Sequence, residues 1–224
     1  MDKIKNLKII AQSCLDGESC GHDFLHCLRV MKIAEDIAHT DFIKINREIL
    51  AAAALMHDIC RPWEKKTGIS HFSEEALGII DEQLDKAEYS AADRLKIIDI
   101  IRWHDIYNPE QIPPSSFTDE LRVHQDADRI DALGAIGIAR TFAFGGSNKL
   151  PLFIPGESLS FNEHFIDQPG DKRSSIAHFY EKLLKLRDQM NTPTGRKLAE
   201  VRHSRMERFL AEFFEEWGVD PTIE

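Results

Sequence analysis

The sequence predicts an all-α protein folded as a helical bundle. Apolar residues recur three and four positions apart, as on one helix face, in nearly every segment. No alternation rich in Val, Ile or Thr is bounded by hairpin turns, so strands are not expected. With 224 residues the chain is long enough to bury a substantial core, and we expect one domain over residues 1–224.

Five segments in the first half of the chain have this helical spacing. His22–Ala38 is the strongest, with a continuous apolar face, and Arg47–His57 is short and rich in alanine, a good helix former. The last segment carries Leu95 and several isoleucines. The expected helices of this half span residues 4–11, 22–38, 47–57, 73–84 and 91–103.

The second half begins with Phe117–Arg140, which reads as one long helix or two and should turn Ile136 inward. Ser175–Met190 and Thr194–Trp217 are expected to form a C-terminal helical pair, at about residues 175–217. Between Arg140 and this pair, Gly145–Asp171 is rich in glycine and proline and should be an irregular loop, either a lid or binding loop or a surface insertion. Its apolar residues favour partial packing against the body: Phe153, Ile154, Leu159, Phe161 and Phe165.

The balance of charge is acidic, with a formal net charge of −10 and a pI of about 5.5. An acidic surface argues against a nucleic-acid polymer as partner, although a metal ion and a few cations can still attract a small anion. No apolar stretch reaches the roughly 18 residues of a membrane span, and the N-terminus lacks a secretory core. We therefore expect a soluble cytoplasmic protein without a membrane partner. Its four cysteines lack structural-zinc spacing and should be reduced thiols.

His57 and Asp58 are the most informative pair, because they end the apolar run Ile49–Met56. A buried unpaired charge is costly, so this pair needs a partner. His26 and the segment Asp126–Asp131 supply suitable donors. The pattern indicates a bound metal ion and hydrolytic chemistry.

The proposed ligands are two imidazoles and two carboxylates from three expected helices. His57 and Asp58 lie about 100° apart around a helix axis and can reach an ion beyond its end. Such a donor set suits a divalent ion such as Mn²⁺, Fe²⁺, Co²⁺, Ni²⁺ or Zn²⁺, whereas Mg²⁺ prefers more oxygen. Four protein ligands on a six-coordinate ion leave two positions, for water and a substrate oxygen.

The ordered set His26, His57-Asp58 and Asp128 resembles that of the HD-domain metal-dependent phosphohydrolases. Longer segments are similar to motifs of a bacterial and fungal branch that resembles nucleotide pyrophosphatases, and the resemblance covers roughly residues 20 to 217. It implies the all-α HD bundle, and it implies His26, His57, Asp58 and Asp128 as metal ligands. The longer segments are His22–Val30, Gln125–Arg140 and His178–Leu186.

Asp126 competes with Asp128 for the fourth ligand position. Two residues apart on a helix, they point about 200° apart, so only one should face the ion. The resemblance favours Asp128, because Ala-Asp-Arg-Ile matches the last motif of the family. Asp131 lies on nearly the same face and is a candidate for supporting contacts.

The catalytic candidates are Asp58, His22 and His104. His22 precedes His26 by one turn and either contacts the substrate phosphate or leaving group or simply starts the helix. His104 ends the isoleucine-rich helix and is expected to face the substrate or donate a proton. The branch usually has a small hydroxyl residue after this histidine, where this chain has Asp105.

Four cations are candidate phosphate contacts: Arg29, Arg140, Lys182 and Lys185. The alternative for each is an ordinary solvated or bundle-internal charge. The role of Arg61, close after the His-Asp pair, is open. His71 is expected to cap a helix or lie at the surface, with metal ligation as the alternative. The remaining histidines should be structural or solvated: His39, His124, His164 and His203.

The resulting hypothesis is a metal-dependent phosphohydrolase that cleaves a phosphate ester or anhydride of a small anionic substrate, a nucleotide, with a metal-activated water. One alternative is a di-iron HD-fold oxygenase, for which His71 and His104 would supply extra ligands. Another is a non-catalytic nucleotide-binding module. An apolar C-terminal face should pack on the body rather than form a homodimer contact: Phe209, Leu210, Phe213, Phe214 and Trp217.

Overall fold

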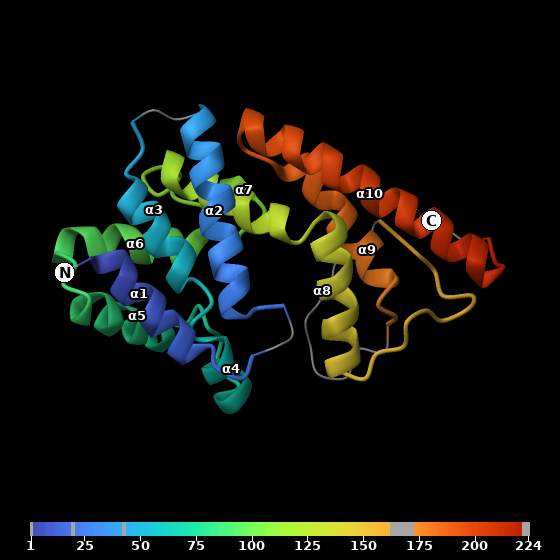
Figure 1. Ribbon diagram of the computed structural model, residues 1–224, viewed down its shortest axis with the longest axis horizontal. Coiled ribbons are helices and arrows are strands. Elements are labelled where there is room, and N and C mark those ends of the chain that lie inside the picture. The colour runs from blue at the N-terminus through green and yellow to red at the C-terminus, as the bar shows by residue number, and fades with distance from the viewer. Residues whose placement is uncertain (1, 19–20, 42–43, 162–172, 221–224) are drawn as a thin grey trace. The chain divides into compact units, whose positions relative to one another are not determined.

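A computed structural model describes residues 2–18, 21–41, 44–161 and 173–220 (Figure 1). Every regular element among these residues is a helix, and none of them forms a β-strand, so the predicted all-α class is confirmed. None of the described helices combines the length and apolar character needed to cross a membrane. His164, Phe165 and Cys20 lie outside the described residues.

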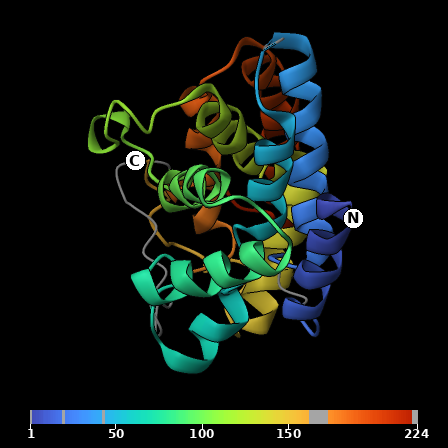
Figure 2. The same ribbon diagram turned by 90° about the vertical axis from the view of Figure 1, so that its left-hand side faces the viewer.

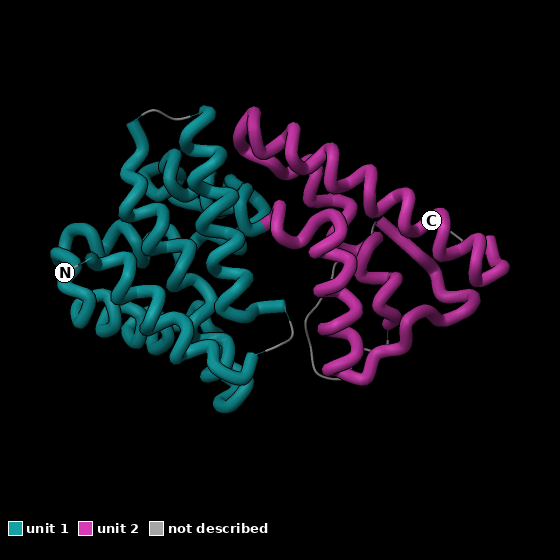
Figure 3. Tube along the Cα trace, in the orientation of Figure 1, with its two compact units in different colours: residues 1–128 teal, residues 129–224 magenta. Residues whose placement is uncertain are grey.

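The chain divides into two compact units, Met1–Asp128 and Arg129–Glu224 (Figure 3). The expectation of one domain over residues 1–224 stays a prediction. The first unit contains the following helices: α1 (Lys3–Cys14), α2 (Phe24–Asp41), α3 (Arg47–Met56), α4 (Arg61–Thr67), α5 (Glu74–Lys86), α6 (Ala91–Trp103), the 3-10 helix η1 (Pro109–Gln111) and the part of α7 (Asp119–Asp131) up to Asp128.

Helix α3 is the centre of the first unit. It packs against α1, α2 and α6, and α2 and α3 lie side by side in both views (Figures 1 and 2). Its run from Ala52 to Met56 is buried all round, which is the pattern of a central rather than a surface helix. Asn46 caps its N-terminus by accepting hydrogen bonds from the backbone N–H groups of Glu48 and Ile49. This anchored helix ends at Met56, directly before the His-Asp pair.

Helices α5 and α6 begin at serine caps. Ser73 accepts a hydrogen bond from the Ala76 N–H, and Ser90 accepts one from the Asp93 N–H. Helix α6 spans the residues expected from the sequence, but its Leu95 is 72% exposed and does not join the core. The short helix α4 was not expected, and it begins immediately after the His-Asp pair.

The described residues of the second unit form four further elements: α8 (Gly134–Ser147), α9 (Ala177–Glu181), the 3-10 helix η2 (Leu183–Gln189) and α10 (Pro193–Trp217). Phe117–Arg140 thus forms two helices, and Ile136 is 43% exposed, so its expected inward position is wrong. The expected continuous helix over Ser175–Met190 is also wrong. It breaks at Lys182, whose φ of −132° and ψ of −61° are not helical.

An aromatic cluster forms the core of the second unit. Phe179 lies between Phe142 and Phe209, with ring centroids 6.1 and 5.8 Å away. Phe153, from the irregular segment after α8, packs against Phe214 and Trp217 of α10. The C-terminal apolar face therefore packs within its own unit, and part of the irregular segment is ordered on it.

Candidate metal centre

Four predicted ligands of the first unit converge on one point. The Nε2 atoms of His26 and His57 are 3.1 Å apart. Asp58 Oδ2 lies 3.5 Å from each of these nitrogens. Asp128 Oδ1 lies 3.3 Å from His26 Nε2 and 3.9 Å from His57 Nε2. We call these four residues the ligand cluster.

The spacing of these atoms fits one first-row divalent ion. Such an ion holds nitrogen and oxygen ligands at about 2.0–2.2 Å, so neighbouring ligand atoms lie about 2.8–3.6 Å apart in octahedral or tetrahedral geometry. The distances of 3.1–3.5 Å within the cluster fall in that range, and the distance of 3.9 Å from Asp128 to His57 lies just above it. The donor set of two imidazoles and two carboxylates is also one such ions accept. The residues therefore fit a metal ion, whose identity the donor set leaves open.

Backbone carbonyl groups orient two of the buried imidazoles, His57 and His104. His57 is the residue after α3, and its Nδ1–H donates to the carbonyl oxygen of Ala54 at 3.0 Å. That hydrogen bond leaves Nε2 with its lone pair toward the cluster. His104 repeats the arrangement after α6, donating from Nδ1 to the Ile101 carbonyl oxygen at 2.7 Å. Burial lowers the pKa of His57 to about 4, against the opposing effect of Asp58 and Asp128, so the ring is neutral at pH 7.

Asp58 is almost completely buried and remains a carboxylate. Burial by itself would raise the pKa of this carboxyl group. His57, His22 and Arg61 have the larger combined effect and hold the pKa well below its usual value. Its two oxygens have different neighbours. Oδ2 faces the histidines, with His22 Nδ1 at 2.7 Å, while Oδ1 accepts a hydrogen bond from Arg61 Nε at 3.1 Å.

The two catalytic histidine candidates both lie at the cluster. His22, two residues before α2, contacts Asp58 and groups with His26 and Asp58 as potential ligands. His104 is buried and groups in the same way with His57 and Asp58. In contrast, no ligand group among the described residues contains Asp126, which is fully buried elsewhere on α7.

The sequence favoured no site role for Arg61, His71 or His124, although all three lie near the cluster. His71 is only 3% exposed and Ser73 caps the helix that follows, so the expected surface or capping position is wrong. Its Nδ1 lies 2.7 Å from Glu64 Oε2. Glu64 in turn lies 3.5 Å from Arg61 Nη1. His124 is fully buried one turn before Asp128, with its ring 5.2 Å from that of His57. Spacing offered two signals: Arg61 follows Asp58 by three residues, and His124 precedes Asp128 by four.

Of the four candidate phosphate-binding cations, one lies on α2 and three lie in the second unit. Arg29 is half-buried on α2, three residues after His26. In the second unit, Arg140 Nη1 donates to the buried Asp131 Oδ2 at 2.9 Å. Lys182 sits at the break between α9 and η2, so it does not share one α-helical face with Lys185. Their roles as phosphate contacts stay predictions.

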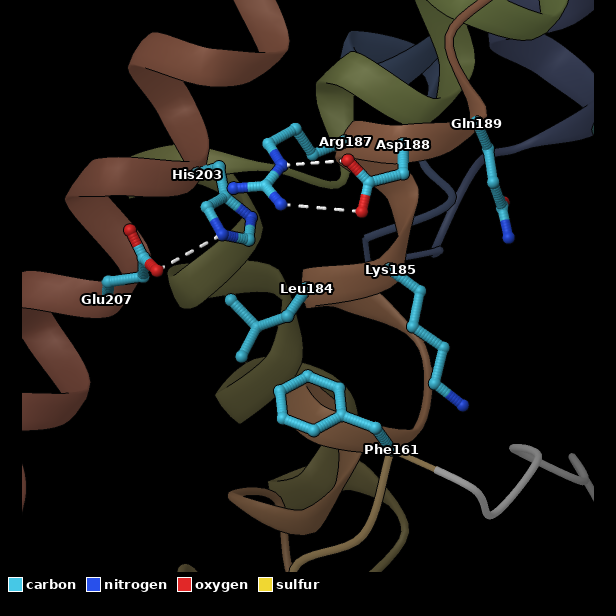
Figure 4. A pocket seen from close by; sticks show the side chains of 8 residues that line it. All are labelled: Phe161, Leu184, Lys185, Arg187, Asp188, Gln189, His203 and Glu207. Carbon is cyan, nitrogen blue, oxygen red and sulfur yellow. Dashed lines mark hydrogen bonds and ion pairs between the residues drawn. The ribbon is translucent and has the colours of Figure 1, made fainter. Parts of the chain in front are cut away.

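Lys185 lines a pocket of about 400 Å³ in the second unit (Figure 4). The pocket holds one ion pair and one histidine–carboxylate pair. Arg187 binds Asp188, and His203 Nε2 lies 3.3 Å from Glu207. Because acids and bases balance there, the pocket lacks the excess of positive charge that an anion site requires.

The fold and the ligand cluster together define an HD-domain protein. The HD domain model matches residues 23–133. The chain is 32% identical over 215 residues to the uncharacterized protein YpgQ of Bacillus subtilis strain 168, covering 94% of this chain and 91% of YpgQ. The chain belongs to the HD-domain superfamily.

Solved structures agree with this assignment. Bacillus subtilis YpgQ in complex with ADP has a TM-score of 0.71 and 31% identity, covering 96% of this chain and 94% of that one. An HD-superfamily hydrolase from Bacillus thuringiensis has a TM-score of 0.69 and 34% identity, covering 98% of both chains. A protein from Lactobacillus plantarum has a TM-score of 0.79 and 29% identity, over 97% of this chain and 98% of that one. The fold is that of HD-superfamily hydrolases.

Proposed function

We propose that this protein is a metal-dependent phosphohydrolase that cleaves a phosphate ester or anhydride of a nucleotide. The observation that carries the proposal is the ligand cluster, in which His26, His57 and Asp128 bring ligand atoms from separate parts of the first unit to within 3.9 Å of one another. A nucleotide is the favoured substrate because the related YpgQ was crystallised with ADP. We assign the metal to His26, His57, Asp58 and Asp128.

When bound, a divalent ion would lower the pKa of a coordinated water and polarise a phosphoryl oxygen. Asp58 would orient the attacking water by accepting a hydrogen bond at its carboxylate. His104, whose Nδ1 is held by the Ile101 carbonyl, would exchange a proton through Nε2. Either it or His22 would protonate the leaving oxygen. The burial of Asp58 strengthens these electrostatic contacts, since little water screens them.

A substrate screen tests the proposal. The protein, freed of metal, would be supplied with Mn²⁺, Mg²⁺, Co²⁺ or Fe²⁺ and with nucleoside mono-, di- and triphosphates or phosphomonoesters. Phosphate and pyrophosphate would be measured separately, because their ratio identifies the bond that is cut. We expect metal-stimulated release of one of the two.

The matched variants are Asp58→Ala and Asp36→Ala. Asp58→Ala should abolish turnover while the circular dichroism spectrum stays helical. Asp36, an exposed aspartate on α2 that pairs with Lys32, serves as the control and should keep full activity when changed to alanine. Full activity in Asp58→Ala would contradict the proposed role.

Two other results would replace the proposal. Two irons per chain together with oxygen consumption would indicate an oxygenase. Nucleotide binding with no metal-stimulated turnover of any compound would indicate a binding module. Metal analysis and an oxygen electrode, run on the same samples, separate these outcomes.

A further inference from the structure

We propose that Arg61 occupies the place of a second metal ion, so that the ligand cluster holds one ion per chain. The inference rests on the proposed metal centre and concerns its stoichiometry. It is based on the contacts of Asp58. One carboxylate oxygen, Oδ2, faces the proposed metal position, whereas the other, Oδ1, binds the guanidinium of Arg61.

A second ion beside the first would need a bridging ligand. Ions in two-metal sites lie about 3.5–4 Å apart, a separation that the two oxygens of one carboxylate can span. In this chain Asp58 Oδ2 is directed at His26 and His57, at 3.5 Å from each Nε2. Its Oδ1 is the oxygen left for a second ion, and Arg61 Nε already binds it at 3.1 Å.

Arg61 is fixed in this position from its far side. Its Nη1 lies 3.5 Å from Glu64 Oε2, and Glu64 is held by His71 Nδ1 at 2.7 Å. An arginine keeps its charge at any pH that the protein tolerates, so the guanidinium repels a cation that approaches Oδ1. Its Nε also stands directly against Oδ1, at 3.1 Å, where such a cation would have to bind.

Two further imidazoles of the first unit are available as donors. His104 groups with His57 and Asp58 as a potential ligand. His71 has a buried Nε2 with no hydrogen-bond partner among the described residues, yet it joins no described ligand group. If a neutral side chain replaced Arg61, we would therefore expect Asp58 Oδ1, His104 and His71 to act as ligands of a second ion.

The same geometry gives Arg61 a chemical task. A guanidinium matches the oxygens of a phosphoryl group and can bind two of them at once. One fixed positive charge with N–H donors would then stand where a two-metal hydrolase has its second ion. Arg61 is thus inferred to determine how many ions the centre holds and to neutralise part of the charge on the substrate.

Metal counting on four proteins tests the inference. The wild-type chain, Arg61→Gln, Arg61→Lys and the control Arg102→Gln would be stripped, loaded with excess Mn²⁺, desalted and analysed by mass spectrometry of the elements. Arg102 pairs with Glu74 at the surface of the same unit and is a matched arginine outside the cluster. Electron paramagnetic resonance would detect the exchange-coupled signal of a Mn²⁺ pair, a readout independent of turnover.

We expect one ion in the wild type, Arg61→Lys and Arg102→Gln, and two coupled ions in Arg61→Gln. Adding His71→Ala to Arg61→Gln should return the count to one. Two ions in the wild type, or a single ion in a folded Arg61→Gln, would overturn the inference. The wild-type count decides the stoichiometry even if Arg61→Gln does not fold. A wild type that hydrolyses nucleotides with two ions contradicts this inference alone, whereas one that binds no ion contradicts the proposed function as well.

Discussion

The ligand cluster of the first unit and the aromatic cluster of the second bury their side chains in opposite ways. Around His57 the protein buries imidazoles and carboxylates, and both ring nitrogens of the neighbouring His124 lack a hydrogen-bond partner among the described residues. Around Phe179 it buries hydrocarbon, with the neighbouring rings stacked or tilted against it. The polar groups buried in the ligand cluster lower the free energy of unfolding, whereas the rings buried in the aromatic cluster raise it.

This difference separates residues that act from residues that hold the fold. A buried polar atom without a partner costs free energy, so its presence calls for an explanation such as a ligand. Buried aromatic rings need no such explanation, because they stabilise through area and packing. We therefore expect substitutions in the two clusters to affect different measurements.

The largest effect should come from Asp128→Asn, which removes a charged ligand but keeps its size. Loss of the ion removes several kcal/mol of transition-state stabilisation, so turnover should fall at least about ten-thousandfold. The matched variant Asp126→Asn should still bind metal, because Asp126 joins no described ligand group. Calorimetric titration with Mn²⁺ measures the binding, and the reverse pattern would assign the fourth ligand to Asp126.

Phe179→Ala should lower stability without touching the metal. Phe179 is fully buried between two aromatic rings, and truncation of such a side chain costs about 3–5 kcal/mol. Urea unfolding measures the loss. Val201→Ala on the exposed side of α10 is the control and should change stability by less than about 0.5 kcal/mol. If Phe179→Ala changed the number of bound metal ions, the two clusters would not affect different measurements as we expect.

A pH effect of intermediate size should come from His178 in the second unit. Burial, and next the charge of Lys182, lower its pKa to about 3, whereas an unfolded histidine titrates near 6.5. As the pH falls below 6.5, the unfolded chain takes up the proton first, so stability is lost progressively down to the folded pKa. The slope from one such proton is at most about 1.4 kcal/mol per pH unit.

His178→Gln removes this proton and sharpens the test. As the pH falls from 7.5 to 5, the wild type should lose unfolding free energy relative to the variant. Comparing the two proteins at each pH cancels the titration of the other histidines. A difference that does not vary with pH would show that His178 has an ordinary pKa.

The smallest effect should come from Asn46→Ala. The side chain accepts two hydrogen bonds at the start of α3, and loss of such a cap costs about 1 kcal/mol. Asn46→Ser keeps an acceptor and should stay close to the wild type in thermal unfolding. Metal binding should not change, because the His-Asp pair lies at the other end of the helix.

The sequence predicted the all-α class and the convergence of His26, His57, Asp58 and Asp128, and the reasons for this also explain what it missed. Helix α6 begins after the Ser90 cap and carries a run of isoleucines, of which Ile97, Ile100 and Ile101 are buried, and both its ends were predicted. The break at Lys182 was missed because apolar residues continue at similar spacing through a 3-10 segment. The ligands follow from the order of a family motif. The contacts of Arg61 and the burial of His71 depend on how helices pack, which spacing alone does not determine.

The two imidazoles at the ends of α3 and α6 are aimed by main-chain carbonyls, not by neighbouring side chains. Drift in the surrounding apolar residues over evolutionary time can therefore leave the ring directions intact as long as the helix ends keep their shape. Because each histidine bonds to a carbonyl only three residues before it, the last helical turn and the histidine form one local unit. A designer could transfer that unit to the end of a helix in another bundle to place an imidazole there.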